Sequence, residues 1–180
     1  MGFRDILFGK KGIDGFEKEI FKISLGVMRK LSKDNWGVIR LVGQHGNLSD
    51  NDIHSIVFEL HLCLLSIGLF NVSTLAKVSE EEKNKIHDGV IRLYQLHLQH
   101  KKAELNLGYL VNYAKEKIPI YMRAFHDDLY SGTGQFQKTI TEILRHVSQP
   151  IVGITLLGIF LAGEIVAAWG KNQDAIKRRF

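Results

Sequence analysis

Apolar and polar residues recur along this chain with a helical period, and no stretch shows the strict two-residue alternation of a strand. The first clear apolar stripe lies in residues 14–33, where large apolar side chains recur every three or four positions. A second begins at a cap formed by Ser49 or Asp50 and runs to about residue 70, with a second half that is almost wholly apolar. Both stripes predict core-forming helices.

Three further helices are predicted downstream. Ser79 and Glu82 stand at the spacing of a capping box, which opens a helix that runs past residue 100. Another helix covers residues 105–130 and contains Pro119, so we expect a kink or a break at that point. A fifth helix is expected over residues 134–148.

The most apolar segment of the chain is residues 151–169, in which Glu164 is the single charge and the mean hydropathy is about 2. Such a segment can be a helix buried within the bundle, because a helix that is apolar all round must be covered. It can also be a helix that enters a membrane. The basic residues that follow it and the cost of placing Glu164 in lipid argue against a simple membrane span, and both alternatives stay open.

These elements predict an all-α fold, a single bundle of five or six helices with a strongly apolar C-terminal helix. We divide the chain into an amphipathic N-terminal segment (1–12), the bundle (13–170) and a basic C-terminal tail (171–180). The segment 36–43 is apolar but broken by glycine, and we assign it no element.

Composition narrows the class of protein. The chain has 180 residues, of which 45% are apolar and 24% charged, as expected for one globular domain. Its lone cysteine, Cys63, lies in an apolar run and can form no disulfide within the chain. The net charge is +5, and the basic residues are spread along the chain with a local concentration at each end. These two concentrations fit either solvated termini or contact with an anionic surface, with a membrane ahead of nucleic acid.

One group of residues could hold a metal ion. His97, His100 and Glu104 fall within an arc of about 60° on one helix, where they continue an apolar stripe. Two imidazoles and a carboxylate could supply three ligands to zinc or iron and leave an open position. The alternative is that the helix leaves the bundle there, so that its face becomes an ordinary wetted surface.

A second pattern concerns nuclease chemistry. The pair Arg92 and His97 is similar in spacing to the motif of HEPN ribonucleases, which are helical bundles, and the resemblance implies a nuclease that uses these two side chains. The sequence departs from that motif because it lacks the polar residue that usually follows the arginine. On one helix the two side chains would also point about 140° apart.

The remaining polar groups are expected to be structural. His54 and His61 share the margin of an apolar stripe, where a histidine normally bonds to the backbone or to a carboxylate. Asp127 and Asp128 are expected at a solvated helix end. The chain has no glycine-rich phosphate loop.

The sequence therefore favours a non-enzymatic helical protein that acts through protein or membrane-surface contacts, without a cofactor. We expect it in the cytoplasm or at the inner face of a membrane. A protein partner or self-association is the expected interaction, a membrane contact is a second expectation, and nucleic acid is not expected. The alternative is a helical-bundle enzyme, either metal-dependent through His97, His100 and Glu104 or HEPN-like through Arg92 and His97.

Overall fold

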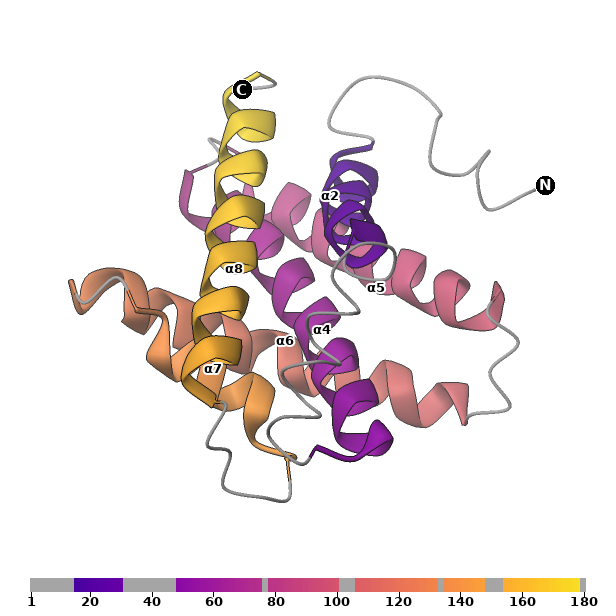
Figure 1. The fold of residues 1–180 in the computed structure, drawn as a ribbon. Helices are drawn as coiled ribbons and strands as arrows, with labels where there is room; N and C mark the ends of the chain where they lie inside the picture. Colours follow the sequence, from indigo (N-terminus) through magenta and orange to yellow (C-terminus); the bar gives the residue numbers. More distant parts are fainter. Residues whose placement is uncertain are drawn as a thin grey trace.

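The computed structural model describes residues 15–30, 48–75, 78–100, 106–132, 135–147 and 154–178. These residues form six helices and include no strand (Figure 1). The helices are α2 (Phe16–Lys30), α4 (Asp50–Leu75), α5 (Glu80–His100), α6 (Leu107–Tyr130), α7 (Gln137–Leu144) and α8 (Ile154–Lys177). The all-α bundle of five or six helices predicted from the sequence is confirmed.

Helix α4 occupies the middle of the bundle and contacts each of the other described helices (Figure 1). Among the described residues, α4 is the one helix whose length and apolar composition would allow it to cross a membrane, over Asp50–Thr74. However, 78% of its most apolar window is buried inside the bundle, as a central core helix requires. The largest fully buried side chains come from α2, α4, α5 and α6: Phe16, Ile20, Phe21, Ile56, Leu60, Leu62, Leu64, Tyr94, Tyr121 and Phe125.

Two capping boxes fix where α4 and α5 begin. The Ser79 N–H donates to Glu82 Oε2 at 2.8 Å, and the Glu82 N–H donates back to Ser79 Oγ at 3.3 Å, as the sequence predicts. The same reciprocal pair forms at α4, where Asp52 N–H donates to Ser49 Oγ at 3.1 Å and Ser49 N–H donates to Asp52 Oδ2 at 3.0 Å. Ser49 rather than Asp50 is therefore the cap of α4.

Of the kink or break expected at Pro119, the break does not occur, because α6 continues through it from Leu107 to Tyr130. A proline removes the bond to the carbonyl four residues earlier, here that of Lys115. Pro119 and Lys115 both lie on the exposed side of α6, so water can reach that carbonyl. Burial of Ile118 and Tyr121 on either side holds the helix together.

Helix α8 extends to Lys177, beyond the segment 151–169 and into the expected basic tail. Its buried stripe explains the extension, because Asn172, Ala175 and Ile176 continue the inward-facing row formed by residues such as Leu161. The rest of the tail, residues 179–180, lies outside the described residues, as do the amphipathic segment 1–12 and the segment 36–43.

Candidate functional site

The predicted metal ligands are only partly placed by the structure. His97 and His100 lie in the last turn of α5, whereas Glu104 lies outside the described residues, so the set of three stays a prediction. The His97 ring is half-buried against Phe21 and His61, with ring centroids 5.9 and 5.7 Å apart. Within the described ranges, no group of three or more His, Cys, Asp or Glu side chains is arranged to hold a metal ion. Metal analysis of protein purified without a chelator tests the set that includes Glu104.

The two residues of the nuclease-like pair face different environments. Arg92 is exposed on the outer side of α5, while His97 packs inward among aromatic rings. This agrees with the divergence of about 140° expected for their spacing on one helix. The structure therefore does not bring the two side chains together in the way a shared catalytic role requires.

The two histidines of α4, His54 and His61, lie in different environments. His54 is exposed, and its Nδ1 donates to the Asp50 carbonyl at 2.6 Å, as expected for a histidine at the edge of a stripe. His61 is buried, and its ring lies edge-on to Tyr94 and His97 at centroid distances of 5.5 and 5.7 Å. His61 is therefore part of the core between α4 and α5.

A buried carboxylate, Glu59, is the centre of a polar network between α4 and α6 that was not predicted from the sequence. Glu59 of α4 is 3% exposed and accepts hydrogen bonds from two hydroxyls of α6. The Tyr121 hydroxyl donates to Glu59 Oε2 at 2.7 Å, and the Tyr113 hydroxyl donates to Glu59 Oε1. Hydrogen bonds of this kind, to a charged acceptor, are about twice as strong as neutral ones.

The network reaches solvent through His146, which follows α7 and is 46% exposed. Its Nε2 lies 3.0 Å from the Tyr113 hydroxyl oxygen and 3.8 Å from Glu59 Oε1. Because the single Tyr113 proton is donated to Glu59, the Tyr113 oxygen accepts from His146, and Nε2 must carry a proton. Three elements, α4, α6 and the end of α7, are thus joined by one chain of hydrogen bonds.

Burial and the neighbouring Glu59 together raise the pKa values of the surrounding tyrosines. Burial first, and then the hydrogen bond and charge of Glu59, raise the pKa values of Tyr113 and Tyr121 well above the usual range. Burial, followed by the charge of Glu59, raises the pKa of Tyr94 as well. The three phenols therefore stay protonated, and this arrangement stabilises a buried carboxylate rather than supplying a phenolate nucleophile.

Two signals in the sequence could have revealed this network. Glu59 is the one acid within the apolar part of its helix, and a buried carboxylate requires donors. Tyr113 and Tyr121 are eight residues apart, which places both on one side of α6, two turns from each other. Sequence alone does not show that this side of α6 faces Glu59, since 54 and 62 positions separate the bonded pairs.

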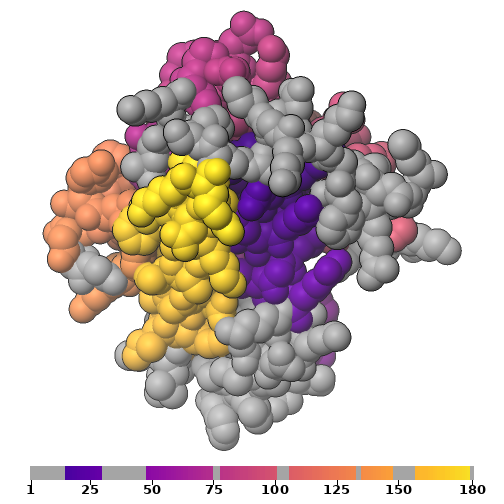
Figure 2. Space-filling view, turned by 90° about the horizontal axis from the view of Figure 1, so that it is seen from above, coloured from indigo at the N-terminus to yellow at the C-terminus, as the bar shows by residue number. Residues whose placement is uncertain are grey.

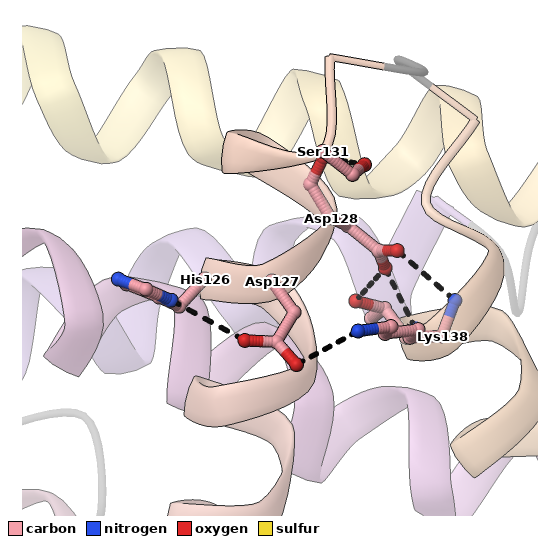
Figure 3. Close-up of polar contacts among 6 residues, drawn as sticks. His126, Asp127, Asp128, Ser131 and Lys138 are labelled. Carbon is pink, nitrogen blue, oxygen red and sulfur yellow. Dashed lines mark hydrogen bonds and ion pairs between the residues drawn. The ribbon is translucent and has the colours of Figure 1, made fainter.

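The two aspartates at the end of α6 differ from the expected solvated helix end (Figure 3). Asp127 is partly exposed and pairs with Lys138 Nζ at 2.9 Å, and this contact lowers the pKa of its carboxyl. Asp128 is only 4% exposed, and it accepts from the Lys138 and Thr139 N–H groups at 3.1 and 2.8 Å. Asp128 therefore caps α7 from another helix, because Phe136, at the N-cap position with φ 48°, forms no side-chain cap.

The remaining candidate is a surface, which we call the outer face of α8 and define as Ile159, Gly163, Val166 and Ala167. All four are exposed, with Ile159 at 66% and Val166 at 45%. The single charge between residues 158 and 170 is Glu164, which is turned inward and is 7% exposed. Figure 2 shows α8 at the molecular surface beside α2.

The inner side of the same helix belongs to the core. Leu157, Leu161, Ile165 and Ala168 are fully buried. Trp169, which follows this row, donates from Nε1 to Asn71 Oδ1 of α4 at 3.1 Å. From residue 157 onward, the apolar segment predicted at 151–169 is thus buried along one side and exposed along the other.

No family model, no curated protein and no solved structure matches the chain.

Proposed function

We propose that this protein is a non-enzymatic helical bundle that works by contact, and that it docks on its partner through the outer face of α8. The observation that carries the proposal is the absence of charge from the exposed positions of α8 between residues 158 and 170, while Glu164 of the same stretch points into the bundle.

A helix at the surface of a globular protein normally presents charged and polar side chains to water. Single exposed apolar residues are common and need no explanation. Here Ile159 and Val166 lie two turns apart on one line, with Gly163 and Ala167 between and beside them. An exposed helix stretch that carries apolar and small side chains and no charge gives a partner a surface it can cover without desolvating a charge.

The small side chains favour docking over catalysis. Gly163 and Ala167 carry no functional group, and a Cβ built at Gly163 would meet no atom within 4 Å. This part of α8 therefore offers a shallow surface without donors, acceptors or nucleophiles. It also offers no charge to a phosphate backbone, which argues against nucleic acid as the occupant of this face.

The proposal is tested by measuring whether the outer face is covered in the cell. Ala167→Cys is compared with Gln95→Cys, which lies on an exposed position of α5. The native Cys63 is fully buried and its thiol pKa is raised by burial, so it does not react with a maleimide in the folded protein.

In purified protein both engineered thiols should react with maleimide at similar rates. In the native host, we expect the thiol at position 167 to react at least about tenfold more slowly than in purified protein, because a partner covers it. The thiol at position 95 should react equally fast in both settings. Equal reactivity of position 167 in the host and in purified protein would show that the outer face of α8 is not a docking surface.

A further inference from the structure

We propose that the surface on which α8 docks is an anionic lipid bilayer, and that α8 lies on it without leaving the bundle. This inference rests on the proposed function, because it names the partner of the same face. Two observations carry it: the charges that follow the outer face, and the small area that the face provides.

The exposed side of α8 changes from apolar to basic at one point along its length. Lys171, Lys177 and Arg178 are all exposed, against one exposed acid, Asp174. At about 100° per residue, Lys177 lies in line with Ile159 and within about 20° of Val166, whereas Asp174 lies about 60° from that line and Lys171 and Arg178 lie about 120° and 100° from it. These exposed residues carry three positive charges against one negative charge, and basic residues beside an apolar face attract a helix to anionic headgroups.

The area of the outer face favours a bilayer over a second protein. The uncharged part of α8 covers about 12 residues, or about 18 Å, and is about 10 Å wide. It therefore provides roughly 200 Å², about a quarter of what each partner buries in a stable protein interface. A bilayer needs no matching shape, and it adds the attraction of its anionic headgroups to the basic end of α8.

The geometry allows this contact without unfolding. Ile159 and Val166 can enter the boundary between headgroups and acyl chains while Leu161 and Ile165, on the opposite side of α8, stay in the core. Glu164 stays within the bundle, so no buried carboxylate has to enter lipid. The helix therefore lies along the membrane surface and does not span it.

Flotation of the purified full-length chain with lipid vesicles tests the inference. We expect binding to phosphatidylcholine vesicles that contain phosphatidylglycerol, and binding at least about tenfold weaker to phosphatidylcholine alone. High salt should weaken the binding to anionic vesicles, because it screens the basic residues.

A matched pair of variants locates the contact. Val166→Asp places a charge on the outer face, and Gln95→Asp makes the same change of charge on exposed α5. Both positions are exposed, so both variants should keep the circular dichroism and melting temperature of the parent protein. We expect Val166→Asp to bind anionic vesicles at least about tenfold more weakly than Gln95→Asp.

The outcomes separate this inference from the function on which it rests. No flotation with anionic vesicles, or equal binding by the two variants, overturns the bilayer as the partner. If position 167 is nevertheless protected in the host, the docking function stands and its partner is a protein or a second copy of the chain. If position 167 is unprotected, the docking function itself is wrong.

Discussion

Helices α4 and α8 are similar in their apolar composition but occupy different positions in the bundle. Each is apolar over most of its circumference, and each carries one buried acid in its apolar stretch, Glu59 or Glu164. Helix α4 lies in the middle and every residue from 59 to 72 is buried. Helix α8 lies at the edge, where residues of the same character are buried on one side and exposed on the other.

This difference shows that a helix that is apolar all round must be covered, but that its apolarity does not identify what covers it. Five other helices cover α4, so its apolar surface is used within the chain. The bundle covers only the inner side of α8. The same hydropathy therefore contributes to the core in α4 and, on the outer face of α8, leaves the apolar surface on which we propose that a partner docks.

The sharpest way to break this comparison is to place a charge on each side of α8. Leu157 is fully buried, so Leu157→Asp buries an unpaired carboxylate and should unfold the domain, a loss of more than about 4 kcal/mol. Ile159 is exposed, so Ile159→Asp should change the free energy of unfolding by less than about 0.5 kcal/mol. Thermal melts followed by circular dichroism measure both. A folded Leu157→Asp variant would show that the inner side of α8 is not part of the core.

The tyrosines around Glu59 of α4 predict that the protein loses stability at alkaline pH. Because the folded-state pKa values of Tyr94, Tyr113 and Tyr121 are raised, the stability that these groups contribute is complete below about pH 10. It is lost as the pH rises above that value, since the unfolded chain releases these protons first. Phenolate absorbance and helical circular dichroism should therefore change together for these three tyrosines. Their complete ionisation in a chain that is still helical would contradict the buried network.

Removing single tyrosine hydroxyls tests how much the hydrogen bonds to Glu59 contribute to stability. Tyr121→Phe removes a donor from the buried Glu59 and should lower the free energy of unfolding by about 1.5–3 kcal/mol. Tyr94→Phe is the matched control, because the Tyr94 hydroxyl is buried without a hydrogen-bond partner among the described residues. Removing it should be neutral or slightly stabilising. Denaturant titration distinguishes the two, and equal losses would show that Glu59 does not depend on Tyr121.

The smallest expected changes in stability come from replacing one glycine in α4 and one in α8 by alanine. A Cβ at Gly68 of α4 would overlap with Ile20 Cγ2, so Gly68→Ala should destabilise the protein by about 1–3 kcal/mol. A Cβ at Gly163 of α8 would meet nothing within 4 Å, so Gly163→Ala should stabilise the helix by about 0.5–1 kcal/mol. Melting temperatures of the two variants should move in opposite directions. A shift in the same direction would mean that α4 and α8 are packed equally closely.

The helices could be predicted because their signals are local. The capping box of Ser79 and Glu82 and the apolar periods of α2 and α4 depend on neighbours within a few residues. At Pro119 the sequence predicts a kink or a break, and the break is wrong because tertiary burial overrides the local preference. Pro119 does not break α6, because Ile118 and Tyr121 anchor the helix on both sides of it.

The candidate sites could be predicted less well, because they depend on which helix faces which. The apolar run that became α8 was recognised, but its division into an inner and an outer side depends on where α4 lies. Glu59 meets Tyr121 across 62 positions, and no period in the sequence encodes that pairing. The third proposed metal ligand, Glu104, lies outside the described residues, so its grouping with His97 stays a prediction.

The cap that Asp128 supplies to α7 has a consequence for the order of folding. Its bonds to Lys138 and Thr139 close loops of only 10 and 11 residues, whereas Glu59 must find Tyr121 over a loop of 62. Short loops close within about 10–100 ns and lose less chain entropy than long ones. The corner between α6 and α7 can therefore form before the bundle assembles, and it presents α6 already joined to α7 when α4 arrives.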